Sequence, residues 1–156
     1  MTDATTVIAL ADDAATRRAG ARLASGLRGG DAIALVGELG AGKTTLVGGV
    51  VAALGGDGAH SPTFALVHEY KTQTVAVWHV DLYRVERESE LAELGLDDVI
   101  GDPRGVAFVE WADKYAVMPR DHLRVELAYD RTGRTLCATS HGPASERLRA
   151  LLDGAW

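Results

Sequence analysis

The chain has 156 residues with a formal net charge of −6; 47% of the residues are hydrophobic and 24% are charged. This balance predicts one globular domain over residues 1–156 that needs no disulfides, and it excludes a broad basic face for gripping nucleic acid. Because there is one cysteine, no leader-like start and no apolar run of about 18 residues, we expect a cytoplasmic protein without a membrane span.

The first half of the chain alternates strand and helix patterns. A continuous apolar run is typical of a strand buried on both faces, and a capping residue such as Asp12 marks the start of a helix. The predicted elements are a strand at 5–10, a helix at 12–27, a strand at 31–36 and a helix at 43–54.

The second half contains hairpins as well as helices. Short polar turns separate paired apolar runs, which is the pattern of antiparallel strands. The predicted elements are a hairpin at 64–70 and 75–80, a helix at 86–94, a strand at 106–111, a hairpin at 122–130 and 134–140, and a helix at 143–152. The chain therefore predicts an α/β fold whose mixed parallel and antiparallel sheet is flanked by helices.

Residues 37–44 read GELGAGKT and match the phosphate-binding loop pattern G-x-x-x-x-G-K-[ST] in full. Glycines in such a loop let backbone N–H groups point inward, where they hold phosphate oxygens together with the helix N-terminus. Lys43 supplies a mobile positive charge, and the Thr44 hydroxyl suits Mg²⁺. The pattern predicts that the chain binds ATP with magnesium.

Sites of this kind need a carboxylate at the end of a neighbouring strand. Asp81 ends the run VAVWHV, and Glu110 ends VAFV. From the residues alone, either acid can face the metal while the other orients water, and a strand-end acid is also often simply exposed. In the same way, the segment at 60–63 (HSPT) is either a loop near the terminal phosphate or a plain Ser-Pro turn.

Five segments in this order resemble the TsaE (YjeE) family of small ATPases, which act in making the threonylcarbamoyladenosine modification of tRNA. They are GELGAGKTTL at 37–46, SPTF at 61–64, HVDLYR at 79–84, ELAELGLDD at 90–98 and VEW at 109–111. The resemblance extends from about residue 5 to about residue 152. Many families share the phosphate loop, whereas the elements at 61–64, 79–84 and 109–111 are far more specific. The resemblance also implies a P-loop NTPase-like fold.

The resemblance implies a role for each motif residue. Lys43 holds phosphates together with the loop residues Gly37, Glu38, Leu39, Gly40, Ala41, Gly42, Thr44 and Thr45. Thr44 and Glu110 serve magnesium, and Asp81 positions or activates water, so that Lys43, Asp81 and Glu110 form the catalytic set. Ser61, Pro62 and Thr63 form a switch-type loop, and Arg134, Asp13 and Thr16 lie near the nucleotide.

The resemblance also implies the partners. Members of the family work with the proteins TsaD and TsaB, and the transfer of the threonylcarbamoyl group belongs to TsaD. ATP hydrolysis would then reset that complex between turnovers, and the chain would interact with tRNA only through the complex. No membrane and no small-molecule acceptor is expected.

Two other functions stay open from the sequence. One is a small-molecule kinase, although no arginine-rich lid is evident. The other is a binding module in which ATP orders a partner-binding face and hydrolysis is vestigial. A GTPase is disfavoured because the chain contains no Asn, so an N-K-x-D element that reads guanine is absent.

Overall fold

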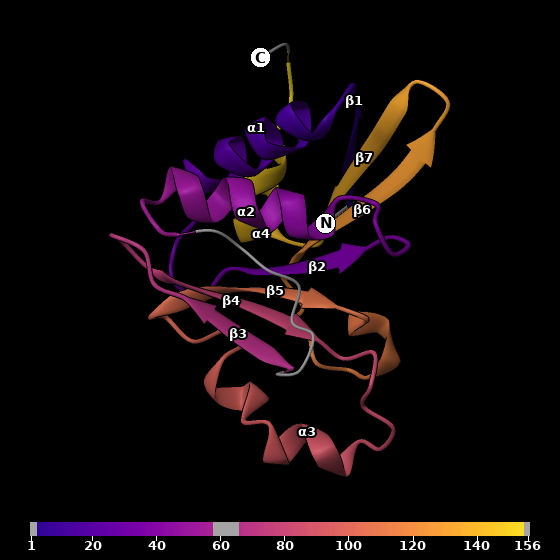
Figure 1. Ribbon diagram of the computed structural model, residues 1–156. Coiled ribbons are helices and arrows are strands. Elements are labelled where there is room, and N and C mark those ends of the chain that lie inside the picture. The colour runs from indigo at the N-terminus through magenta and orange to yellow at the C-terminus, as the bar shows by residue number, and fades with distance from the viewer. Residues whose placement is uncertain (1–2, 58–65, 155–156) are drawn as a thin grey trace.

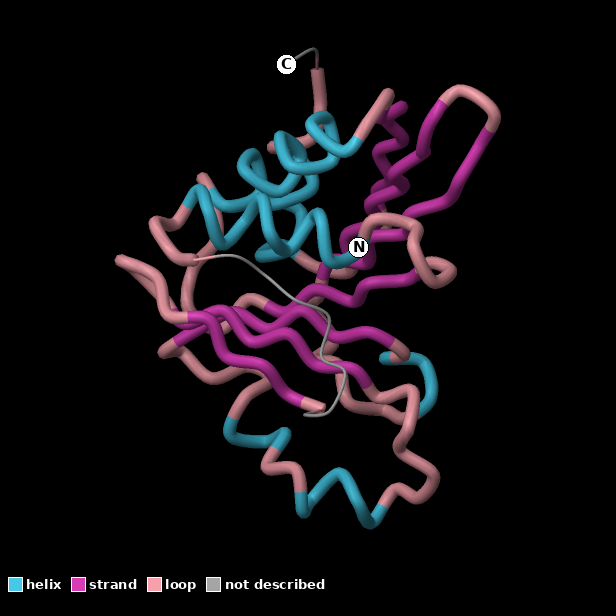
Figure 2. Tube along the Cα trace, viewed as in Figure 1, coloured by secondary structure: helices cyan, strands magenta, loops and turns pink. Residues whose placement is uncertain are grey.

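A computed structural model describes residues 3–57 and 66–154 of the chain. These residues form four α-helices and seven strands (Figure 1; Figure 2). In chain order they are β1 (Ala4–Leu10), α1 (Asp13–Ala24), β2 (Ala32–Val36), α2 (Lys43–Ala53), β3 (Val67–Tyr70), β4 (Ala76–Asp81), α3 (Ser89–Glu93), β5 (Gly105–Glu110), β6 (Leu123–Asp130), β7 (Gly133–Ser140) and α4 (Pro143–Ala150). Two 3-10 turns, η1 (Leu96–Asp98) and η2 (Ala112–Lys114), follow α3 and β5.

The strands form one mixed sheet in the order β1-β7-β6-β2-β5-β4-β3. The central strands β6, β2, β5 and β4 run parallel, whereas β7 and β1 on one side and β3 on the other pair antiparallel. This confirms the predicted α/β fold with a mixed sheet. Because β2, β5 and β4 are parallel neighbours, their carboxyl ends meet at one edge, which is where α/β sheets bind ligands.

Helices cover the two faces of the sheet unequally (Figure 1). Helices α1, α2 and α4 pack on one face over a large apolar core that includes Ile33, Leu35 and Phe108. The segment that contains α3 and η1 covers the other face at β4 and β5, around Val80 and Val109. The sheet is thus buried on both faces at its parallel centre, as the continuous apolar runs predict.

Helices α1 and α2 approach each other closely because each presents a glycine at their crossing. A Cβ atom at Gly20 would lie 2.3 Å from the Leu46 carbonyl oxygen, and one at Gly49 would lie 2.3 Å from the Arg17 carbonyl oxygen. Any side chain at these positions would push the helices apart. The close crossing fixes the start of α1 relative to the start of α2.

One helix boundary differs from the sequence-based expectation. Helix α1 ends at Ala24 rather than near Leu27, because Ser25 follows and its Oγ donates a 2.6 Å hydrogen bond to the Arg22 carbonyl oxygen.

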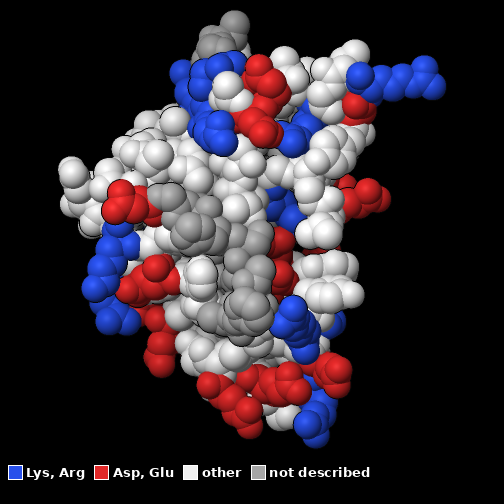
Figure 3. Space-filling model, in the orientation of Figure 1, with Lys and Arg blue, Asp and Glu red and all other residues white. Residues whose placement is uncertain are grey.

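Within the described ranges, the longest helix has 12 residues, and none is long and apolar enough to cross a membrane. On the face drawn in Figure 3, acidic side chains gather around α3, and basic ones are scattered among them and at the opposite end. This face therefore carries no continuous basic surface.

Candidate functional site

The segment of residues 37–42 leaves the carboxyl end of β2 and leads directly into α2. Gly42 caps the helix with a left-handed backbone (φ 109°), a conformation that favours glycine. A Cβ atom at Gly37 would lie 2.7 Å from the Leu127 carbonyl oxygen, so no side chain fits there. The first N–H groups of a helix have no partner inside the helix and carry its positive dipole end. The segment therefore has the geometry of a glycine-rich turn that leads from a strand into a helix, and phosphate binding by this turn stays a prediction.

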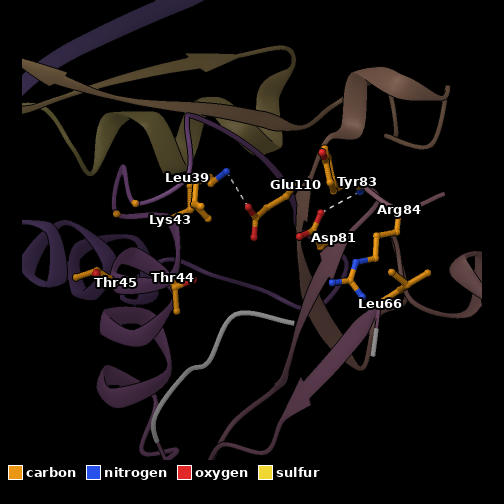
Figure 4. Close-up of a pocket in the computed structure, with 11 residues that line it drawn as sticks. Leu39, Lys43, Thr44, Thr45, Leu66, Asp81, Tyr83, Arg84 and Glu110 are labelled. Carbon is orange, nitrogen blue, oxygen red and sulfur yellow. Dashed lines mark hydrogen bonds and ion pairs between the residues drawn. The ribbon is translucent and has the colours of Figure 1, made fainter. Parts of the chain in front are cut away.

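Lys43, the first residue of α2, reaches back across the loop. Its Nζ donates a 2.6 Å hydrogen bond to the Gly37 carbonyl oxygen and lies 2.9 Å from Oε1 of Glu110 (Figure 4). Glu110 ends β5, the strand next to β2. The fold therefore joins the loop lysine to the acid of the neighbouring strand.

Glu110 is a buried carboxylate with two partners. Only 7% of its side chain is exposed, and its Oε2 lies 2.6 Å from Nε2 of His79, whose side chain is fully buried. Burial by itself would raise the pKa of Glu110. The hydrogen bonds that Glu110 accepts from His79 and Lys43, together with the charge of Lys43, outweigh burial, so the pKa of Glu110 lies below its ordinary value. Glu110 is therefore held as an anion at neutral pH.

Asp81 stands directly opposite Glu110 in the parallel register of β4 and β5. Burial raises the pKa of Asp81, the nearby Glu110 charge adds to this, and a 3.0 Å hydrogen bond from the Tyr83 backbone N–H partly opposes it. Two acids side by side thus differ in environment: Glu110 is paired with Lys43 and His79, whereas Asp81 has a backbone donor. Different settings of this kind suit different chemical roles.

A cleft of about 470 Å³ brings most of the predicted site residues together (Figure 4). Six loop and helix residues line it with the two acids: Leu39, Gly40, Gly42, Lys43, Thr44 and Thr45 with Asp81 and Glu110. Gly37, Glu38 and Ala41 line the adjoining larger cleft. Within the described residues, no three His, Cys, Asp or Glu side chains converge to hold a metal alone. This donor set fits Mg²⁺, which is usually held by one or two protein oxygens plus phosphates and water.

Arg134 and Asp13 form an ion pair beside the same loop, although 121 positions separate them. The Arg134 side chain also lies over the Tyr129 ring, with its guanidinium carbon 5.3 Å from the ring centroid, and next to Gly42. Its Nε is buried and makes no hydrogen bond with any described residue. The Nε–H donor of Arg134 is therefore unused within the described residues, and it lies beside the phosphate loop.

Among the other predicted nucleotide contacts, Thr16 is less accessible than Arg134. Thr16 is fully buried in α1, and its hydroxyl donates a hydrogen bond to the Asp12 carbonyl oxygen. Its side chain therefore supports the helix start in this conformation, and its role near adenine stays a prediction. Ser61, Pro62 and Thr63 lie outside the described residues.

Sequence reasoning missed three residues of the site. His79 binds Glu110, and Tyr83 and Arg84 line the cleft. All three belong to the HVDLYR element, so their place in that motif was the available signal. Trp111, the last residue of the VEW segment, lines the larger cleft and is 48% exposed. It packs against Tyr83 with ring centroids 5.2 Å apart.

Comparisons with known proteins agree with this geometry. Residues 10–136 match the family model described as "Threonylcarbamoyl adenosine biosynthesis protein TsaE". A TsaE protein from Nostoc sp. is 37% identical over 135 residues, which cover 84% of this chain and 83% of the relative. A Streptomyces coelicolor TsaE protein is 42% identical over 116 residues, covering 71% of this chain and 77% of the relative.

Among solved structures, the crystal structure of Bacillus subtilis YdiB superimposes with a TM-score of 0.75 at 26% identity. The match covers 96% of this chain and 94% of the YdiB chain, so the whole sheet and its helices correspond. Together with the family model and the relatives, this establishes that the chain belongs to the TsaE family of threonylcarbamoyl adenosine biosynthesis proteins.

Proposed function

We propose that this chain is a magnesium-dependent ATPase that serves the biosynthesis of threonylcarbamoyladenosine in tRNA by acting on TsaD and TsaB. The observation that carries the proposal is the contact between Lys43 and Glu110, 2.9 Å apart between a phosphate loop and the end of the adjacent strand. A phosphate-binding turn alone would support binding only. The buried acid beside it supports hydrolysis as well.

Each residue has a distinct task in this proposal. The loop amides and the Lys43 ammonium bind the phosphates of ATP, whose charge replaces Glu110 as the partner of Lys43. Glu110, held as an anion, and the Thr44 hydroxyl supply oxygen ligands to magnesium. When bound, Mg²⁺ neutralises charge that develops on the phosphate oxygens. Asp81, whose raised pKa makes it a better proton acceptor, orients the attacking water.

Arg134 is proposed to contact the nucleotide from the side of β7. Its exposed partner Asp13 competes for the guanidinium, so a phosphate or ribose oxygen can take its place at small cost. The scattered charge of the chain supports an encounter with tRNA through the protein partners rather than directly.

The test is magnesium-dependent ATP hydrolysis by the chain alone and with its TsaD–TsaB pair, with Lys43→Ala as the control. We expect slow turnover alone, a marked increase with the pair, and neither activity in Lys43→Ala. ATP binding without turnover in either setting would instead favour a binding module. Phosphorylation of a metabolite would favour a kinase.

A further inference from the structure

His79 occupies an unusual position for a histidine. It lies on β4, two residues before Asp81, and its side chain has no exposed surface. In the parallel register it stands beside Phe108, so His79, Asp81, Phe108 and Glu110 share the face that α1 and α2 cover. The imidazole therefore lies inside the core, directly behind the two carboxylates of the cleft.

The two partners of Glu110 bind different oxygens. Lys43 lies 2.9 Å from Oε1, and Nε2 of His79 lies 2.6 Å from Oε2. Lys43 is a shared partner because it also donates to the Gly37 carbonyl oxygen, and in the proposed function it turns to phosphate. His79 is a dedicated partner: its Nδ1 is buried and makes no hydrogen bond with any described residue.

This bonding pattern shows which ring nitrogen of His79 donates to Glu110, and it argues against a role for His79 in packing alone. An ionised carboxylate only accepts hydrogen bonds, so Nε2 of His79 carries a proton and donates it to Glu110, whereas Nδ1 has no partner among the described residues. A buried polar atom without a partner costs about 1–3 kcal/mol of stability, a cost that an apolar side chain of similar size would avoid. A histidine at this position therefore lowers the stability of the fold, and its one side-chain hydrogen bond within the described residues is the contact with Glu110.

We propose that His79 is a positioning residue that holds Oε2 of Glu110 and so keeps Oε1 aimed at the phosphate loop when Lys43 leaves for the nucleotide. Without His79, a free carboxylate would rotate, and its affinity for magnesium would fall. Partners of this kind behind a metal-binding group typically contribute about 10–100-fold to metal affinity or activity. This proposal rests on the proposed function, because it needs Glu110 to meet magnesium.

The test compares His79→Leu with His79→Gln in the full chain. Leu fills a similar volume without a donor, whereas the Gln side-chain amide can donate to Glu110. Calorimetry measures ATP affinity with magnesium and with EDTA, and the ratio of the two affinities is the readout. We expect His79→Leu to lose about tenfold in this ratio, with EDTA affinity within about twofold of wild type, because the loop itself is intact. His79→Gln should recover most of the ratio.

A second arm uses metal-free protein and detects the contact itself. The ¹⁵N spectrum of the His79 ring should show a protonated Nε2, and its resonance should shift in Glu110→Gln. Thermal unfolding checks that each variant is folded. An unchanged affinity ratio in folded His79→Leu, or no rescue by Gln, overturns the positioning role. If wild type gains no ATP affinity from magnesium, the proposed function fails and this role fails with it, whereas the NMR arm still reports whether His79 holds Glu110.

Discussion

Two charged clusters flank the phosphate loop, and they differ in their contact with water. The inner cluster joins Lys43, Glu110 and His79, with 11%, 7% and 0% of their side chains exposed. The outer cluster joins Arg134 to Asp13, whose side chains are 16% and 55% exposed. Both clusters contain an ion pair between segments distant in the sequence. Both charged groups are largely removed from water in the pair Lys43–Glu110, whereas Asp13 in the outer pair remains hydrated.

This difference decides what each cluster can do. Breaking a buried pair leaves an uncompensated charge in a medium of low dielectric, whereas an exposed partner is simply hydrated again. A substitution in the inner cluster should therefore change both the stability of the fold and the activity of the site, because each member keeps another one paired. The outer cluster can exchange a partner for a ligand with little effect on folding.

Lys43→Ala tests the inner cluster most severely. We expect ATP affinity to fall by about 10–100-fold, because a charge-assisted contact is lost. The free energy of unfolding should also fall by about 3 kcal/mol, the low end for breaking a buried pair, because His79 still binds Glu110. Nucleotide titration and urea unfolding measure the two effects.

The exposed Lys71→Ala serves as the matched control and should change neither quantity. Adding Glu110→Gln to Lys43→Ala should restore most of the stability but none of the affinity, since it removes the unpaired charge. Full ATP affinity in Lys43→Ala would contradict the assignment of the loop.

Asp81→Asn separates turnover from stability. Turnover should fall by about 10²-fold if Asp81 positions water. Because the folded chain raises the pKa of Asp81, its ionised form destabilises the fold once the pH exceeds the ordinary value of 3.8. The variant should therefore have a higher Tm than wild type at pH 7 and a similar Tm at pH 3. Unchanged turnover would refute the water-positioning role.

Only part of the inner cluster could be predicted from the sequence. Apolar runs identified β4 and β5 and placed Asp81 and Glu110 at their ends, because parallel strands bring their carboxyl ends together. The contact of His79 with Glu110 was not predictable, since it depends on the register between two strands and on which face α2 covers. A histidine inside an apolar run carries no signal of its partner.

The outer cluster was predicted differently. Arg134 and Asp13 were each assigned to the nucleotide from the family resemblance, but their ion pair follows from the packing of β7, β1 and the start of α1. Thr16, which the resemblance also places near the nucleotide, is fully buried in α1, and nothing in the sequence indicated this burial. Patterns locate elements and residue types, whereas tertiary packing decides which side chains meet.

Arg134→Ala tests the outer cluster and should have a smaller effect. We expect a loss of about tenfold in ATP affinity, in line with one hydrogen bond to a charged group. The free energy of unfolding should fall by at most about 2 kcal/mol, the sum of an exposed ion pair and a contact with the Tyr129 ring. Asp13→Ala discriminates two roles: lower affinity means that Asp13 meets the nucleotide, and equal or higher affinity means that it only competes for Arg134.

The smallest effect is expected far from the site, where Glu146 on α4 accepts hydrogen bonds from Arg149 and from Ser140 Oγ, the latter at 2.6 Å. The Arg149 hydrogen bond, followed by that of Ser140, lowers the pKa of Glu146 to about 2 from an ordinary value of 4.5. A depressed folded-state pKa stabilises the fold above about pH 4.5, and this contribution is lost as the pH falls toward about 2.

Carboxyl NMR should therefore find Glu146 still ionised at pH 3. The difference in free energy of unfolding between wild type and Glu146→Gln should become smaller as the pH falls from about 4.5 to about 2. In Arg149→Lys the pKa should rise, because a single ammonium replaces the forked guanidinium. An ordinary pKa for Glu146 in the wild-type chain would mean that water fully screens this surface pair and that the pair contributes nothing measurable to folding.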